Sequence, residues 1–417
     1  MTQNFKAPKL RFPGFTEDWE QRKLEESFDF LQNNTLSRAE LGDSGTALNV
    51  HYGDILVKFG DCIDVSLNEL PHITNQSSVE KLKNSYLKDG DVVMADTAED
   101  ETVGKCSELT DIKDKIVLSG LHTIPLRPKN KFGKGYLGYY LNSGSYHDQL
   151  KPLMQGIKVT SISKSALKNT IVSFPRDVSE QEKIGNFFIR IDNLITLHQR
   201  KFETLKKLKK GFLQKMFPKN GESVPEIRFP GFTDAWEQRK FSELYAKVTE
   251  KNDLSFGADK IISVANMYFK EDTKESSDDY MKTYNVMRLG DIAFEGNRNK
   301  NYAHGRFVEN TIGDGIVSHV FDVFRPIVDY DLNYWKYYIN NEIVMGRTMA
   351  RCTKSSTMMT NLVANDFLKE AVLVPVLEEQ KKIGQYFSNL DNLITLHQRK
   401  LDTLKKLKQG MLQQMFI

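Results

Sequence analysis

The chain has 417 residues, with 58 Lys and Arg against 55 Asp and Glu and a formal net charge of +3, which excludes a globally polycationic protein but allows a local basic face. This length exceeds what one hydrophobic core usually serves and indicates two or three domains. Three widely spaced cysteines without a CxxC pair, an N-terminus without the apolar core of a signal peptide, and no apolar run of about 18 residues predict a soluble, cytoplasmic protein.

The first predicted element is a motif that occurs twice. RFPGFTEDWEQRK at 11–23 returns as RFPGFTDAWEQRK at 228–240. The Pro-Gly pair at the centre of Phe-Pro-Gly-Phe is typical of a type II turn, and Trp19 and Trp236 are expected to anchor each copy to its domain. A second duplicated segment, DNLITLHQRK, lies at 192–201 and at 391–400. The sequence therefore predicts two copies of one unit.

Between the repeated ends lie two variable segments, 24–179 and 241–378, whose sequences look largely unrelated. Both contain short β-branched runs separated by Gly, Asp and Asn, which is typical of strands. Both also continue a Gly-Asp pair into an apolar run, from Gly90 and from Gly290. Short helices are expected at GYLGYYLNS and LNYWKYYINNE. We therefore predict an α+β fold class, with two mixed α/β domains of similar fold and different surfaces.

Motifs that carry catalysis are missing from the variable segments. The sequence contains no Walker A, HExxH or GxSxG pattern. Gly133 to Gly138 match GxGxxG, but they follow the charged RPKNKF instead of the buried strand that a dinucleotide site requires. We interpret them as a loop that enters a short helix, and the acids between Asp96 and Glu101 as solvated loop residues. No catalytic or metal-binding residue is predicted.

Polar, basic segments are the candidates for nucleic-acid contact. Residues 155–169 and 347–361 occupy equivalent places and mix Lys or Arg with Ser, Thr, Asn or Gln, and 295–306 has a similar composition. Such side chains donate to phosphates and read base edges, although ordinary polar loops share this composition. The DNA-binding candidates are Lys158, Thr160, Ser161, Ser163, Lys164, Lys168, Asn297, Arg298, Asn299, Lys300, Arg351, Thr353, Lys354, Ser355 and Ser356.

Each copy is predicted to end in a long amphipathic helix. Ser179 to Glu182 fit a capping box, and apolar residues recur at intervals of seven from Ile184 and again from Ile383. Each helix should run for about 36 residues, or about 55 Å. Because a single apolar stripe needs a partner, the two helices are expected to form an antiparallel coiled coil.

Two features of these helices allow alternative interpretations. His198 and His397 lie inside the heptad series, where each could fix the helix register as a lone polar residue or belong to a metal pair or a pH switch. The stretch from Arg200 to Lys219 holds eight Lys or Arg against one acid. It could be a solvated helical face or a surface for phosphates or an acidic partner.

The duplicated RFPGFTxxWEQRK motif, the EQxKIG helix start and the DNLITLHQRK helix together resemble the specificity (S) subunits of bacterial type I restriction-modification systems. The resemblance spans the whole chain, and only the second helix start, PVLEEQ, departs from the first by lacking the Ser cap. It implies target recognition domain 1 at 1–178, a conserved spacer helix at 179–220, target recognition domain 2 at 221–375 and a second spacer helix at 376–417.

The same resemblance implies a non-catalytic subunit whose two recognition domains each read one half of a split site in double-stranded DNA. The two helices would dock two methyltransferase (M) subunits, and restriction (R) subunits would complete the ATP-dependent nuclease. S-adenosylmethionine, ATP and Mg²⁺ would belong to these partners, and no cofactor is expected in this chain. The alternatives are a stand-alone DNA-binding coiled-coil protein without enzymatic partners and an independent nuclease.

Overall fold

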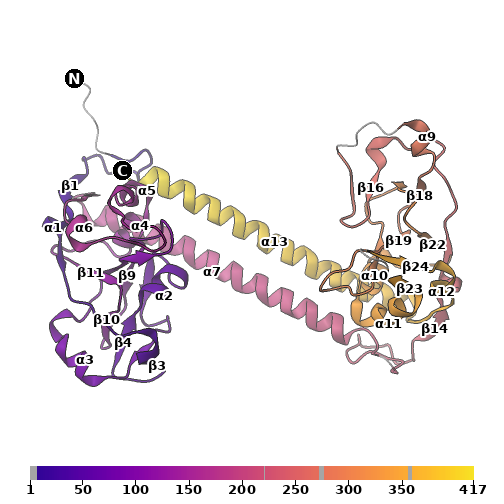
Figure 1. Ribbon diagram of the computed structural model, residues 1–417, viewed down its shortest axis with the longest axis horizontal. Coiled ribbons are helices and arrows are strands. Elements are labelled where there is room, and N and C mark those ends of the chain that lie inside the picture. The colour runs from indigo at the N-terminus through magenta and orange to yellow at the C-terminus, as the bar shows by residue number, and fades with distance from the viewer. Residues whose placement is uncertain (1–6, 220, 272–276, 356–358) are drawn as a thin grey trace. The chain divides into compact units, whose positions relative to one another are not determined.

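A computed structural model describes residues 7–219, 221–271, 277–355 and 359–417. The chain folds into two compact units (Figure 1). Unit 1 comprises Met1–Gln199 together with Arg399–Ile417, and unit 2 comprises Arg200–Gln398. Each unit therefore combines one variable segment with a stretch of both long helices.

Unit 1 contains two larger sheets, formed by the short β-branched runs. One has the strand order β2 (Phe28–Phe30), β11 (Thr123–Pro128), β7 (Val92–Ala95), β9 (Cys106–Thr110), β5 (Cys62–Asp64). The other has the order β10 (Ile116–Ser119), β4 (Ala47–Val50), β6 (His72–Ile73), β3 (Leu41–Gly42). Two short antiparallel pairs are β1 (Glu20–Lys23) with β13 (Ile171–Phe174) and β8 (Thr97–Ala98) with β12 (Thr160–Ser161). The short helices are α1 (Leu24–Ser27), α2 (Tyr52–Val57), α3 (Gln76–Lys81), α4 (Tyr136–Asn142), α5 (Gly144–His147) and α6 (Lys164–Leu167).

Among the described residues of unit 2, the larger sheet has the strand order β15 (Tyr245–Lys247), β22 (Val323–Pro326), β19 (Ile292–Glu295), β20 (Arg306–Glu309). Four further antiparallel pairs are β14 (Glu237–Lys240) with β25 (Ala371–Val374), β16 (Ile262–Ser263) with β17 (Tyr268–Phe269), β18 (Asn285–Met287) with β21 (Gly315–Val317), and β23 (Thr353–Ser355) with β24 (Thr360–Leu362). The short helices are α8 (Phe241–Leu244), α9 (Asp278–Met281), α10 (Leu332–Ile339), α11 (Glu342–Cys352) and α12 (Ala364–Lys369). The predicted α+β class and the two predicted short helices, α4 and α10, are confirmed.

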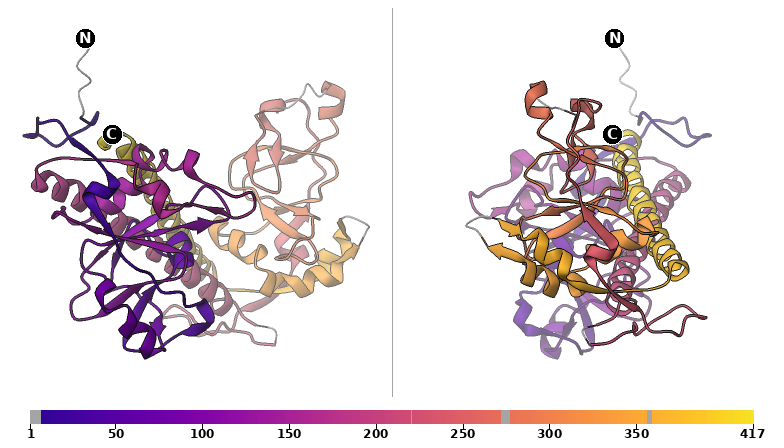
Figure 2. Two further views of the ribbon diagram at one scale, coloured as in Figure 1. Left: turned by 60° about the vertical axis from the view of Figure 1, so that its left-hand side comes forward. Right: turned by 90° about the vertical axis from the view of Figure 1, so that its right-hand side faces the viewer.

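The long helices are α7 (Val178–Lys215) and α13 (Leu377–Met415). In each unit a stretch of α7 runs beside a stretch of α13 (Figures 1 and 2). In unit 1, Asp192 pairs with Lys408, and Phe188 stacks on Phe416 with ring centroids 5.8 Å apart. The residue number falls on α7 as it rises on α13, so the helices are antiparallel, as predicted.

Each core is completed by the end of a long helix. In unit 1, Phe416 packs edge-on against Trp19 and Tyr136, with ring centroids 6.4 and 5.8 Å apart. In unit 2, Phe217 contacts Trp236 in the same way at 6.4 Å. Both tryptophans are buried, so their predicted role as anchors is confirmed. The tryptophan that follows each RFPGF motif therefore connects that motif to the end of a long helix.

The first turn of α7 differs from the prediction. Ser179 was expected to cap the helix, but the helix already includes Val178, and the Asp177 carboxylate accepts the Ser179 amide at 2.8 Å. The predicted capping box is therefore wrong. Glu180, expected within that box, is buried instead and accepts two hydrogen bonds from Arg11 at 2.6 and 2.7 Å. A charged pair of this kind ties the start of the helix to the RFPGF motif.

His198 and His397 lie inside α7 and α13, and both are half-buried. Both interpretations of these residues, a polar residue that fixes the helix register and a metal pair or pH switch, stay predictions. Over the described ranges, no helix is long and apolar enough to cross a membrane.

Candidate nucleic-acid interface

In unit 1 the candidate segment folds into a hairpin beside β8. Thr160 and Ser161 form β12, which pairs with β8, and Ser161 also exchanges backbone hydrogen bonds with Gln155. Lys158 lies in the exposed turn between them, next to Ile157, whose side chain is fully exposed. The turn therefore presents one basic side chain, Lys158, and two apolar side chains, Ile157 and Val159, to solvent.

The rest of this segment has local structural roles. Ser163 caps α6, because its hydroxyl accepts the Ala166 amide at 3.2 Å. The Lys164 ammonium group donates to the Leu31 carbonyl at 3.1 Å. Lys168 follows the last turn of α6 and is exposed. Of these three candidates, only Lys168 presents a side chain that the fold does not use.

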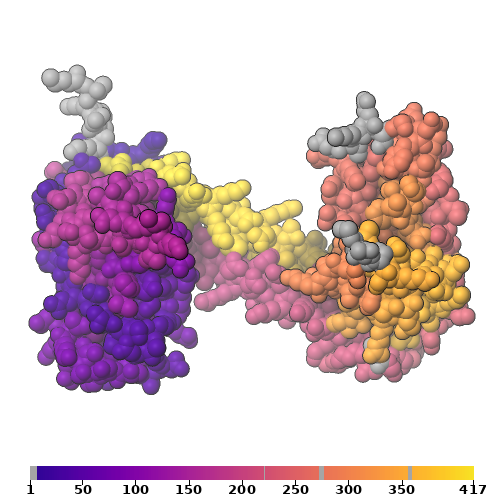
Figure 3. All heavy atoms as spheres, viewed as in Figure 1, coloured from indigo at the N-terminus to yellow at the C-terminus, as the bar shows by residue number. Residues whose placement is uncertain are grey.

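In unit 2 the structure brings two candidate segments together. Asn297 pairs with Met359 across an antiparallel bridge, and the Thr360 amide donates to the Gly296 carbonyl at 2.8 Å. Arg298, Asn299 and Lys300 follow in an exposed turn. The loop after β19 and the β23–β24 hairpin therefore share one surface, and both lie on the face of unit 2 that Figure 3 shows.

The remaining candidates differ in whether their side chains already have partners within the protein. Arg351 is engaged by Glu370, and the Thr353 hydroxyl donates to the Met349 carbonyl at 2.6 Å. Lys354 and Ser355 are exposed on β23. Ser356 lies outside the described residues.

The two units carry opposite charge at one equivalent position. After β7 the chain continues as Asp-Thr-Ala-Glu-Asp-Glu at 96–101, and after β19 as Gly-Asn-Arg-Asn-Lys-Asn at 296–301. The first segment pairs with the candidate strand β12, and the second forms a bridge to Met359, the residue before β24. In the part of the chain that the structure describes, no group of three or more His, Cys, Asp or Glu side chains is arranged to hold a metal ion.

A duplicated polar network between the helices was missed by sequence reasoning. In unit 1, Asp192 accepts a hydrogen bond from Tyr139 at 2.7 Å and pairs with Lys408 at 2.7 Å. In unit 2, Asp391 does the same with Tyr337 and with Lys209, at 2.7 and 2.5 Å. The sequence contains a sign of this network, because these Asp and Lys residues are identical in both copies. The heptad pattern alone, however, does not show which Asp pairs with which Lys.

The GxGxxG segment holds a carboxylate of the protein itself. The buried Glu108 side chain accepts the Gly135 amide at 2.7 Å and the Gly138 amide at 3.0 Å. Burial raises the pKa of Glu108 to about 7, against the lowering effect of these amides. The amides that would cradle a phosphate are therefore occupied, which supports the interpretation of this segment as a loop entering α4.

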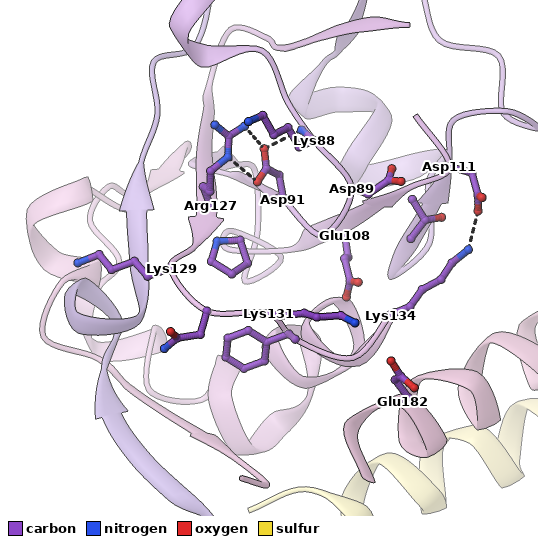
Figure 4. Close-up of a pocket in the computed structure, with 15 residues that line it drawn as sticks. Lys88, Asp89, Asp91, Glu108, Asp111, Arg127, Lys129, Lys131, Lys134 and Glu182 are labelled. Atoms are coloured by element: carbon purple, nitrogen blue, oxygen red, sulfur yellow. Dashed lines mark hydrogen bonds and ion pairs between the residues drawn. The ribbon is translucent and has the colours of Figure 1, made fainter. Parts of the chain in front are cut away.

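The cavity beside Glu108 has a volume of about 460 Å³ (Figure 4). Its basic lining residues are Lys88, Arg127, Lys129, Lys131 and Lys134, and its acidic lining residues are Asp89, Asp91, Glu108, Asp111 and Glu182. Arg127 is paired with Asp91, and Lys134 with Asp111. Balanced charge of this kind does not favour an anionic ligand.

Known proteins share the sequence pattern and the fold. The type I restriction modification DNA specificity domain matches residues 16–207 and 234–406. The chain is 23% identical to the MjaX type I restriction enzyme specificity subunit of Methanocaldococcus jannaschii, over 98% of this chain and 94% of that protein. It is 25% identical to the MjaVIII specificity subunit of the same organism, over 69% and 70%. The fold matches that of a type I restriction-modification S subunit from M. genitalium, with a TM-score of 0.59, 13% identity and 99% of both chains covered.

The chain therefore belongs to the family of type I restriction-modification DNA specificity subunits, because the family match covers most of both units. Within this family it is the non-catalytic component that gives the system its DNA specificity, and it has two target recognition domains.

Proposed function

We propose that the two units read the two halves of a split DNA site. Unit 1 would contact one half through the 155–161 hairpin and Lys168, and unit 2 would contact the other through the loop after β19 and the β23–β24 hairpin. The division into recognition domains at 1–178 and 221–375, with spacer helices at 179–220 and 376–417, belongs to this proposal.

The observation that carries the proposal is the contrast between conserved and variable parts of the duplication. Between Asp192–Phe217 and Asp391–Phe416, 21 of 26 positions are identical. At the equivalent loops after β7 and β19 the charge is opposite, acidic at 96–101 and basic at 296–301. Because base preference depends on the pattern of donors and acceptors that a protein presents, two different surfaces on one repeated scaffold suit an asymmetric target.

The long helices would dock two methyltransferase subunits. Three leucines are exposed on the helices of unit 1, and the three equivalent leucines are exposed in unit 2: Leu194, Leu197 and Leu407, and Leu393, Leu396 and Leu208. Clustered apolar side chains on a helical surface favour protein contact. Identical sets in both units suit two copies of one partner, and restriction subunits would join through the methyltransferases. S-adenosylmethionine, ATP and Mg²⁺ would be bound by these partners.

Co-expression with the methyltransferase subunit tests the proposal. Purification through a tag on this chain should recover two methyltransferase copies per chain, and methylation sequencing of the host should reveal one bipartite motif. A chain that binds DNA specifically but recovers no methyltransferase would favour the stand-alone DNA-binding alternative.

A further inference from the structure

Unit 2 has a groove of about 500 Å³ beside the candidate loop after β19. Asn301 and Tyr302 of this loop form one side of the groove, and three lysines from α7 and α10 form much of the rest: Lys209, Lys210 and Lys336. The groove therefore connects a candidate DNA-reading loop with the basic stretch of α7.

The donors in this groove are only partly used. Lys209 is paired with Asp391 at 2.5 Å. Lys210 and Lys336 are exposed, and neither forms a hydrogen bond or an ion pair with a described residue. Asn340 accepts the Tyr302 hydroxyl on Oδ1 at 2.7 Å, which leaves its Nδ2 directed to no described acceptor. The groove thus offers at least three N–H donor groups to an incoming acceptor.

The equivalent place in unit 1 is occupied by an anion of the protein. Lys408 and Asn142 occupy the positions of Lys209 and Asn340 in the repeat. The Asp61 carboxylate accepts from Lys408 at 2.7 Å and from Asn142 Nδ2 at 2.8 Å. The fold therefore binds a carboxylate between this Lys and this Asn.

Unit 1 also lacks the two additional lysines of the groove. Gln409 stands at the position of Lys210, and Gly138 at that of Lys336. Of these three lysine positions, the unit that supplies its own carboxylate has one lysine, and the other unit has all three. This difference between the two units is expected if the groove of unit 2 binds an anion that is not part of the chain.

We propose that this groove binds a phosphodiester of the DNA backbone, next to the bases that the loop after β19 reads. The inference rests on the proposed reading of DNA by unit 2. A backbone phosphate is the favoured anion because the groove wall is continuous with the candidate loop, and contacts to phosphates commonly position a protein on the duplex. The groove would hold the register of unit 2 on its half-site without reading sequence.

Two acids also line the groove. Asp391 already has Lys209 and the Tyr337 hydroxyl as partners. Glu342 is half-buried, and burial raises the pKa of its carboxyl group. Apart from the Lys209–Asp391 pair, the groove lining thus contains two lysines, Lys210 and Lys336, and one acid, Glu342, so a bound phosphate meets net positive charge.

The test uses the complex of the full chain with methyltransferase subunits and a duplex that carries its methylated motif. A Lys210→Gln and Lys336→Gln double variant should bind this duplex about three- to tenfold more weakly at 0.15 M salt, and the slope of log K against log salt should fall by about one to two. The methylated sequence should not change. A Lys207→Gln and Lys406→Gln double variant, which removes two exposed lysines of the long helices outside the groove, is the matched control.

Neutral methylphosphonates, placed one at a time along both half-sites, identify the phosphate. One substitution should weaken the wild-type complex and have little further effect in the groove variant. Equal affinities of the groove variant, the control and the wild type would overturn the inference. Loss of methyltransferase from the groove variant, with normal DNA binding by what remains assembled, would assign the groove to a partner carboxylate and also overturn it. A wild-type complex that binds no specific DNA would overturn the proposed function as well.

Discussion

At the scale of single residues, the two copies treat one buried carboxyl group differently. Glu108 on β9 and Glu309 on β20 pair with equivalent positions, Val92 and Ile292. Glu108 accepts backbone amides, whereas the buried Glu309 carboxyl oxygens have no hydrogen-bond partner among the described residues. Burial accordingly raises the pKa of Glu309 further, to about 9. A variable segment can thus diverge even at positions inside the core.

This difference predicts a pH dependence of stability. The folded pKa of Glu309 lies above its ordinary value of 4.5, so its contribution is fully present below about pH 4.5 and is lost as the pH rises toward 9. Between pH 6 and 8, unfolding free energy should fall by up to about 1.4 kcal/mol per pH unit from this group. Glu309→Gln should remove that slope, as measured by urea unfolding, whereas Glu378→Gln at an exposed site should keep it. Parallel slopes in all three proteins would contradict the prediction.

For single residues, prediction from the sequence succeeded where the size and chemistry of one side chain were enough to indicate its place in the fold. Trp19 and Trp236 could be recognised as anchors because a large aromatic residue beside a turn needs a core. The lysine partners of Asp192 and Asp391 could not, because they lie more than 180 positions away in the chain. The same limit applies to the candidate interface, since pairing of Asn297 with Met359 depends on sheet register.

At the scale of elements, the repeated KIG of each helix start has a steric cause. A Cβ added at Gly185 would lie 2.1 Å from the Lys134 carbonyl oxygen. A Cβ added at Gly384 would lie 2.3 Å from the Asp331 side-chain oxygen Oδ1. The long helix and the loop before α4 or α10 can pack this closely only without a side chain. The sequence revealed the repeat of this glycine, but its cause required the position of a loop distant in sequence.

A pair of glycine substitutions on one helix tests this explanation. Gly185→Ala should destabilise the protein by about 2 kcal/mol or more, because backbone atoms must move. Gly211→Ala, on the same helix with nothing within 4 Å of the added Cβ, should stabilise it by about 0.5–1 kcal/mol. Calorimetric unfolding of the full chain should therefore shift in opposite directions. A similar shift for both variants would mean that close packing does not explain the repeated glycine.

At the scale of the whole molecule, sequence difference between the two copies is concentrated in the variable segments, which predicts modularity. Exchanging residues 24–178 for the corresponding segment of a related specificity subunit should change one half of the methylated motif. The other half and the spacer should stay as they were, because unit 2 and both long helices are retained. Methylation sequencing of the host measures all three at once, and a change in both halves would mean that the units do not read independently.

The long helices predict a way to change the spacer. Inserting a second copy of residues 199–205 after Leu205, and of 398–404 after Leu404, preserves the heptad phase and lengthens each helix by about 10 Å. Both Asp–Lys pairs keep their partners within their own units, since Asp192 and Lys408 lie on one side of the insertions and Asp391 and Lys209 on the other.

Along B-DNA, 10 Å corresponds to about three base pairs. The methylated motif should retain both half-sequences and gain a longer spacer. Affinity should fall, because three added base pairs also rotate one half-site about the duplex axis. An unchanged spacer with full activity would mean that the helices only dock partners and do not set the separation of the half-sites.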